Sequence, residues 1–152
     1  MPDLSPNLSR SEFACKCGRP ECNRTPVDVL LVRYLQETVH FFEKHPPIEG
    51  SFKRIAININ SGHRCIAYDL ELKNLKPEDF NGIKLSEHVW GGAADFWMEV
   101  VLESGRRIKI PDDMIADFLE LRFEGRFGIG RYDGRTHFDV RPYCARWDNR
   151  GK

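Results

Sequence analysis

The segment formed by residues 86–95 constrains the fold of this 152-residue chain more than any other feature. It places His88 and Asp95 seven positions apart, on either side of the pair Gly91 and Gly92. Glycine permits a sharp bend because it has no Cβ atom, so both side chains can converge on one point. A second histidine, His137, lies in a run that alternates like a β-strand. A fold that brings the three side chains together would hold two imidazoles and a carboxylate, which is the ligand set of an open catalytic zinc site.

Hydrophobic periodicity predicts a mixture of helices and strands. Apolar residues recur at helical spacing over residues 26–45, and Pro46 ends that segment. A second helix is expected over residues 111–121, because Asp112 suits the first turn of a helix. Strands are expected at residues 54–60, 93–102, 107–110, 127–132 and 136–140, with a tight turn at 133–135.

The other segments show weaker patterns. Residues 1–25 look irregular, apart from one helical turn that Ser9 would cap. Residues 66–85 mix charged and apolar side chains without a clear period, and they end in a polar loop at 77–84. We expect an α+β fold, with a small antiparallel sheet and flanking helices, in a single domain over residues 1–152. The segment before residue 26, which contains cysteines, would pack on that domain.

Length and composition narrow the function classes. The chain is long enough for one domain with a sizeable core, and its 41% hydrophobic and 30% charged residues are typical of globular proteins. Lys plus Arg and Asp plus Glu each number 23, and this balance argues against a dedicated nucleic-acid binder. No apolar run approaches the roughly 20 residues needed to span a bilayer. The first residues lack the basic and apolar regions of a secretory signal, so we expect a cytoplasmic protein as synthesised.

The five cysteines need a separate account. Their odd number and the missing signal argue against a disulfide framework. Cys15, Cys17 and Cys22 lie in a loop-like segment and would hold a structural zinc ion if a fourth ligand, Cys144 or a histidine, came close in space. One disulfide, or free thiols, is the alternative. Cys65 is expected to be a small buried apolar side chain.

Three motifs, taken in order, resemble a known family. They are the Ser-Gly-His-Arg turn at residues 61–64, the segment 86–95, and the His-Phe-Asp triplet at 137–139. Together they resemble the zinc D-alanyl-D-alanine carboxypeptidases, peptidase family M15, in their compact subgroup, over about residues 10–148. That subgroup includes peptidoglycan endopeptidases and phage endolysins, and it shares its fold with hedgehog signalling domains. The resemblance therefore implies a hedgehog/DD-peptidase-like fold.

The resemblance also implies roles for individual residues. His88, Asp95 and His137 would be the ligands of one catalytic zinc ion. Arg64 and Ser61 match positions that bind the carboxylate or the peptide backbone of the substrate. A guanidinium suits this role because it pairs with a carboxylate through two parallel hydrogen bonds.

The general base is the least defined of these roles. Asp139 matches the His-x-Asp form of the subgroup, and we expect it to be the base; the alternative is that it orients a ligand histidine. Asp133 is the second candidate base, although a turn residue is its simpler interpretation. His63 stands where the family usually has a Tyr, and it either lines the cleft or packs elsewhere.

The activity implied by the resemblance is hydrolysis of amide bonds in peptidoglycan stem peptides or cross-links, with zinc activating water. The enzyme would be a monomeric carboxypeptidase or endopeptidase that reaches the cell wall after lysis or as part of a phage particle. It would insert into no membrane and bind no nucleic acid. A second hypothesis is a phage structural or binding module that keeps the fold and the metal site without turnover. A third is a small interaction domain organised by the N-terminal cysteines.

Overall fold

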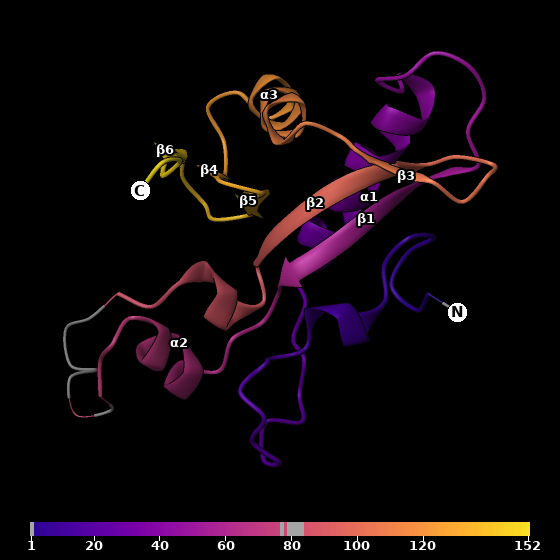
Figure 1. Cartoon of the computed structure of the whole chain (residues 1–152). Coiled ribbons are helices and arrows are strands. Elements are labelled where there is room, and N and C mark those ends of the chain that lie inside the picture. Colours follow the sequence, from indigo (N-terminus) through magenta and orange to yellow (C-terminus); the bar gives the residue numbers. More distant parts are fainter. Residues whose placement is uncertain (1, 77, 79–83) are drawn as a thin grey trace.

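The computed structural model describes residues 2–76, 78 and 84–152, and it confirms the expected mixture of helices and strands (Figure 1). The helices of the described residues are α1 (Val29–Lys44), α2 (Ile66–Leu72) and α3 (Asp112–Arg122), with the short 3-10 helices η1 (Arg10–Phe13) and η3 (Glu87–Trp90). The strands are β1 (Arg54–Ser61), β2 (Ala93–Val101), β3 (Arg107–Lys109), β4 (Gly128–Tyr132), β5 (Arg135–Asp139) and β6 (Ala145–Asp148).

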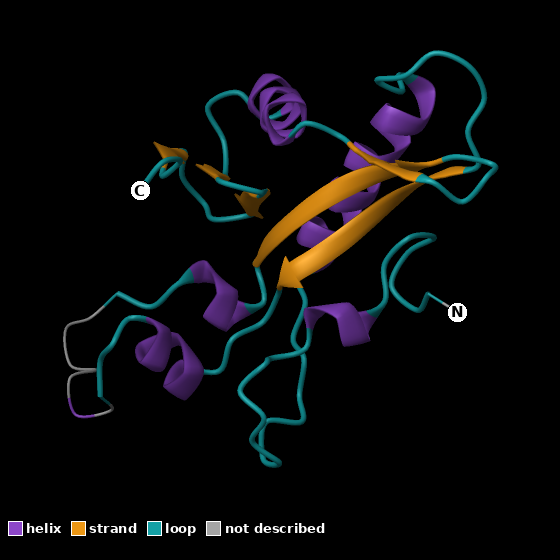
Figure 2. Cartoon of the chain, in the orientation of Figure 1, coloured by secondary structure: helices purple, strands orange, loops and turns teal. Residues whose placement is uncertain are grey.

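The six strands form one sheet in the order β1-β2-β5-β4-β6, and β3 also pairs with β2. Figure 2 colours the strands orange and the helices purple. The pairs are antiparallel except for β4 and β6, which run parallel. The expectation of a purely antiparallel sheet was therefore wrong at this edge. The chain reverses at the β4–β5 hairpin and again after β5, so β6 runs in the direction of β4 when it pairs there.

Helix α1 begins at Val29, three residues later than the expected start at residue 26. Asp28 has an extended conformation, and its side chain accepts a hydrogen bond from the Leu30 N–H at 2.8 Å. This is the arrangement of an N-cap, which satisfies a backbone donor that the helix itself leaves free. The capping chemistry of Asp28 therefore decides the start of the helix, and Pro26 stays outside it.

Some elements were not expected from the sequence. Helix α2 lies in the segment that shows no clear hydrophobic period. Its buried residues are Asp69 and Leu70, so the helix has no apolar stripe that the sequence could reveal. Strand β6 is short and its residues are half-buried or exposed, so it carries no alternating pattern. The polar loop expected at 77–84 lies outside the described residues, apart from positions 78 and 84. The turn at Ser9 is confirmed as η1, with the Ser9 N–H bonded to Glu12 Oε2 at 2.7 Å.

Alternation along β2 and β5 separates the core from the opposite face of the sheet. Ala94, Phe96 and Phe138 belong to the hydrophobic core, to which α1 and α3 also contribute buried side chains. Successive side chains of a strand point to opposite faces, so Asp95 and His137 project from the face away from this core. Local strand geometry therefore presents these two polar residues together.

The N-terminal segment packs on the rest of the chain. Leu8 and Phe13 are fully buried in the core. The Phe13 carbonyl accepts a hydrogen bond from the His63 N–H at 2.8 Å. A Cβ atom at Gly62 would lie 2.5 Å from Phe13 Cα, so only glycine allows this close approach. No helix among the described residues is long and apolar enough to cross a membrane.

Candidate metal centre

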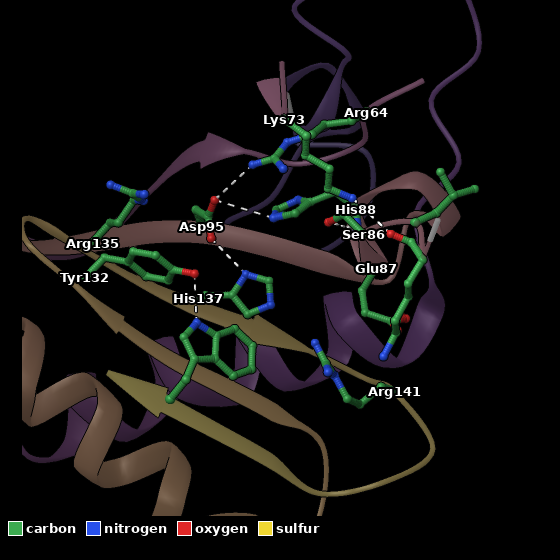
Figure 3. A pocket seen from close by; sticks show the side chains of 13 residues that line it. Arg64, Lys73, Ser86, Glu87, His88, Asp95, Tyr132, Arg135, His137 and Arg141 are labelled. Carbon is green, nitrogen blue, oxygen red and sulfur yellow. Dashed lines mark hydrogen bonds and ion pairs between the residues drawn. The ribbon is translucent and has the colours of Figure 1, made fainter. Parts of the chain in front are cut away.

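His88, Asp95 and His137 reach one point from three different elements (Figure 3). His88 lies on η3, whose N-cap Ser86 accepts a hydrogen bond from the His88 N–H at 3.2 Å. Gly91 ends η3 in the left-handed conformation, with φ of 75°, and so allows the chain to turn into β2. Asp95 on β2 and His137 on β5 are directly paired across the two strands.

The three side chains offer one ligand atom each, and these atoms lie within 4.8 Å of one another. His137 Nδ1 is 2.9 Å from Asp95 Oδ1, and His88 Nε2 is 3.4 Å from Asp95 Oδ2. All three side chains are buried. The structure thus brings the three expected ligands together in a group that could hold a metal ion.

One ring nitrogen of each histidine is held by a hydrogen bond on the side away from Asp95, so the other nitrogen points toward the shared position. His88 Nδ1 lies 2.6 Å from the Gly62 carbonyl oxygen, which can only accept, so Nδ1 carries a proton and Nε2 is the nitrogen that faces Asp95. His137 Nε2 lies 2.7 Å from Asp139 Oδ2, and its Nδ1 lies 2.9 Å from Asp95 Oδ1, so a metal ion at this point would take the place of a proton on Nδ1. Metal-binding histidines are usually fixed in this way through their second nitrogen. The donor set therefore fits a divalent transition metal such as zinc.

Asp139 lies behind His137 and has no exposed surface. Its Oδ1 accepts hydrogen bonds from the Arg141 backbone N–H and from Arg141 Nε, and its Oδ2 accepts from Arg141 Nη2 and pairs with His137. A Cβ atom at Gly128 would lie 2.3 Å from Asp139 Oδ2, so a glycine at that position makes room for the carboxylate. A general base needs a lone pair within reach of its substrate, and this arrangement favours the orienting role of Asp139 instead.

The charges of the centre are strongly coupled. Burial by itself would raise the pKa of Asp95, but hydrogen bonds with His137 and His88 outweigh it and hold that pKa well below its usual value. Burial would raise the pKa of Asp139 too, yet His137 and Arg141 lower it. For His137, burial favours the neutral form, but the hydrogen bonds to Asp139 and Asp95 raise its pKa. Two buried carboxylates are thus ionised at neutral pH, and they favour positive charge on the His137 ring that lies between them or on a metal ion beside Asp95.

The three residues lie at the wall of a cleft of about 310 Å³. Figure 3 shows that basic side chains from several elements surround the cleft. Those that line it are Arg64, Lys73, Lys84, Arg135 and Arg141. Glu87 and Asp95 line it as well, so basic side chains outnumber acidic ones by five to two, and this excess of positive charge attracts anionic groups.

Arg64 lines this cleft, as expected, whereas Ser61 does not line it and instead contacts the Arg64 side chain. A bulge between Ile59 and Ser61 places Ser61 opposite Asp95 in the sheet. The Ser61 Oγ atom accepts from Arg64 Nε at 3.3 Å, and Arg64 Nη2 lies 3.5 Å from Asp95 Oδ2. The guanidinium is therefore held at the edge of the metal centre by neighbours on two strands.

Two other candidates lie away from the cleft. His63 lines a separate cavity beside Cys22 and Cys65, and burial lowers the pKa of its imidazole. Asp133 sits in the β4–β5 turn, where its carboxylate accepts a hydrogen bond from the Gly151 N–H at 2.8 Å. The simpler interpretation of Asp133 as a turn residue agrees with this position.

Sequence reasoning missed Tyr132 and Trp147, which line the cleft. Trp147 Nε1 donates a hydrogen bond to the Tyr132 hydroxyl at 2.7 Å, and the Trp147 ring lies 5.0 Å from that of His137. A Cβ atom at Gly130 would lie 2.4 Å from the indole, so the glycine makes room for it. Strand alternation was the signal that could have placed Tyr132, because it lies two residues after Gly130, which pairs with His137.

Sequence reasoning also missed Asp69, a fully buried carboxylate on α2. It pairs with Lys73 at 2.8 Å and Arg64 at 3.5 Å, and accepts from the Ser86 N–H at 3.2 Å. It therefore links the turn that carries Arg64 to the segment that carries His88. The spacing of four residues between Asp69 and Lys73 was a local signal for an ion pair, but it did not indicate the burial of Asp69 or its contacts with Arg64 and Ser86.

We expect Asp69→Asn to lower the free energy of unfolding by about 2–3 kcal/mol, because it removes one partner of buried charges. Burial would raise the pKa of Asp69, but Lys73 and the Ser86 N–H outweigh it and lower that pKa. The carboxylate therefore stabilises the fold above its unfolded-state pKa, and this contribution is lost as the pH falls through the lower folded value. The difference between parent and variant in urea unfolding should shrink as the pH is lowered below about 4.

The matched control is Asp117→Asn, which removes a carboxylate that is 70% exposed and pairs with Arg131 at the surface. We expect a change of no more than about 0.5 kcal/mol there. A pH-independent difference for Asp69→Asn would show that its carboxylate charge does not stabilise the fold.

Cys15, Cys17, Cys22 and Cys65 form a second group, with one sulfur atom from each within 4.8 Å of the others. Two expectations were wrong. Cys65 is half-exposed and completes the group, whereas Cys144 is exposed and is not part of it. The fold places the start of α2 against the N-terminal loop, which the spacing of the first three cysteines does not reveal.

No protein-family model, curated protein or solved structure matches this chain. Its functional interpretation rests on the residues of the two clusters and on their geometry.

Proposed function

We propose that this protein is a zinc-dependent peptidase that hydrolyses amide bonds in the stem peptides or cross-links of peptidoglycan. The observation that carries the proposal is the buried group of His88, Asp95 and His137, in which the Gly62 carbonyl and Asp139 fix the outer nitrogen of each imidazole and the inner nitrogens face Asp95. Zinc bound by three such ligands serves as a Lewis acid and activates water. The motif resemblance to the zinc D-alanyl-D-alanine carboxypeptidases supports the same chemistry and a related fold.

The side chains around the centre have the properties needed to hold a peptide. Arg64 presents its guanidinium at the edge of the centre and would pair with a substrate carboxylate or carbonyl. The Tyr132 hydroxyl accepts a hydrogen bond from Trp147, so its own proton is free to bind a substrate oxygen. A hydrogen-bond donor fixed in advance beside the reacting carbonyl stabilises the charge that develops there. The basic wall of the cleft suits the carboxylates of peptidoglycan peptides.

In this proposal Asp139 positions His137 and does not touch the substrate. Its carboxylate holds the Nε2 proton of His137, which keeps Nδ1 directed at the metal position. Arg141 in turn holds both oxygens of Asp139. The chain from Arg141 through Asp139 to His137 thus preorganises the centre.

The test is to measure bound zinc and the release of new amino groups when the purified protein acts on peptidoglycan. We expect zinc-dependent release that stops when zinc is chelated and returns when it is restored. Mass spectrometry of the products then separates free D-alanine, the mark of a carboxypeptidase, from opened cross-links. A protein that binds zinc at His88, Asp95 and His137 but neither releases D-alanine nor opens cross-links would contradict the peptidase proposal. That result would favour the binding-module hypothesis.

A further inference from the structure

We propose that Cys15, Cys17, Cys22 and Cys65 bind a second zinc ion, which has a structural role. The four sulfur atoms lie within 4.8 Å of one another and the thiols are free. A tetrahedral zinc ion with Zn–S bonds of about 2.3 Å holds its sulfur ligands roughly 3.8 Å apart. The observed group therefore needs only small side-chain movements to close around an ion.

The backbone around the group is arranged for sulfur atoms that carry negative charge. The Cys65 N–H donates to Cys15 Sγ at 3.3 Å, and the Arg19 N–H donates to Cys17 Sγ at 3.4 Å. The Arg19 guanidinium also lies 4.0 Å from Cys65 Sγ. Hydrogen bonds to sulfur are strongest when it is a thiolate, the form in which cysteine binds zinc.

The loop that carries three of the cysteines has the local structure such a site needs. Gly18 adopts the left-handed conformation, with φ of 73°, directly after Cys17. The Cys22 N–H then bonds to the Arg19 carbonyl at 3.0 Å, which closes a turn. The chain therefore reverses between the second and third cysteines, so that all of them face Cys65.

The ion would tie the N-terminal loop to the turn that carries Arg64. Cys65 follows Arg64 directly and is the N-cap of α2. The same turn provides the Gly62 carbonyl that orients His88. The role in positioning Arg64 and His88 rests on the proposed function, whereas the four-cysteine site stands independently of it.

Two measurements on the whole protein test this site. After reconstitution with cadmium or cobalt(II), thiolate ligands give a ligand-to-metal charge-transfer absorption that a site made of histidine and aspartate lacks. We expect this absorption in the parent protein, with about two metal ions bound per chain. It should persist in His88→Ala, with about one ion bound, and disappear in Cys65→Ser.

The matched control is Cys144→Ser, which removes the exposed cysteine outside the group and should leave the absorption and the metal content unchanged. A second measurement needs no variant. In the zinc-loaded parent a thiol reagent should modify Cys144 rapidly and the other four cysteines only after chelation. Equal reactivity of the five thiols with and without zinc, or a protein mass reduced by the hydrogens lost in disulfides, would overturn the proposal even if Cys65→Ser fails to fold.

Discussion

His88→Ala is expected to lower peptide-bond hydrolysis by about a thousand-fold or more, equivalent to about 4 kcal/mol of transition-state stabilisation. The side chain provides one of the three ligand atoms of the buried group, and it lies between the Gly62 carbonyl and Asp95. Zinc at this centre should be lost, as measured by metal analysis after dialysis. Circular dichroism should show that the protein remains folded, because His88 lies on a short 3-10 helix at one edge of the core.

Two further variants make this result specific. His45→Ala removes an exposed histidine at the C-terminal end of α1, which does not line the cleft. This variant should still bind zinc and hydrolyse the substrate. Asp95→Asn keeps the shape of the side chain while removing the charge between the two histidines, and it should lose zinc as His88→Ala does. Full hydrolysis by His88→Ala or Asp95→Asn would exclude this group as the catalytic centre.

Asp139→Asn is expected to weaken zinc binding by roughly 10-fold to 100-fold, because the amide no longer fixes the His137 ring as the carboxylate does. It should also lower the free energy of unfolding by about 3 kcal/mol, since Arg141 loses the charge that it pairs with through two hydrogen bonds. Hydrolysis should fall at low zinc and recover when zinc is raised to saturation. Zinc titration followed by initial rates gives both quantities.

This recovery separates the two roles considered for Asp139. A general base would leave zinc binding unchanged and hydrolysis low at every zinc concentration. Asp133→Asn is the matched control, because Asp133 was the second candidate base and lies in an exposed turn. We expect no change in zinc binding or hydrolysis there. Low hydrolysis at saturating zinc in Asp139→Asn would return Asp139 to the role of base.

The three residues expected as ligands meet in the structure, and part of their pattern is local. His88 and Asp95 flank a glycine-containing bend, and His137 and Asp139 alternate with Phe138 in a strand. Residue type and strand alternation already indicate which side chains share a face. The same reasoning placed the long helix and most strands, with errors of a few residues at their ends. The capping role of Asp28 explains the largest of these shifts.

The sequence could not predict contacts between segments that lack a local signature. Cys65 looked like a small apolar residue because its partners lie in the N-terminal loop, and Asp69 looked like one of many charged residues. The sequence also left two roles open for Asp139, because it does not show that Arg141 contacts both oxygens of that carboxylate. Burial and the direction of hydrogen bonds depend on packing, which one-dimensional patterns do not contain.

The sequence by itself determined the chemistry available to this protein: two imidazoles and a carboxylate beside an arginine, and a set of thiols. Only the tertiary structure decided how these groups combine. Strands β2 and β5 pair in a register that places Asp95 opposite His137, and this register creates the metal centre. A shift by one residue would point one of the two side chains toward the core. Packing of the N-terminal segment against the turn before α2 assembles the four cysteines, because distant segments meet only when the core that joins them has formed.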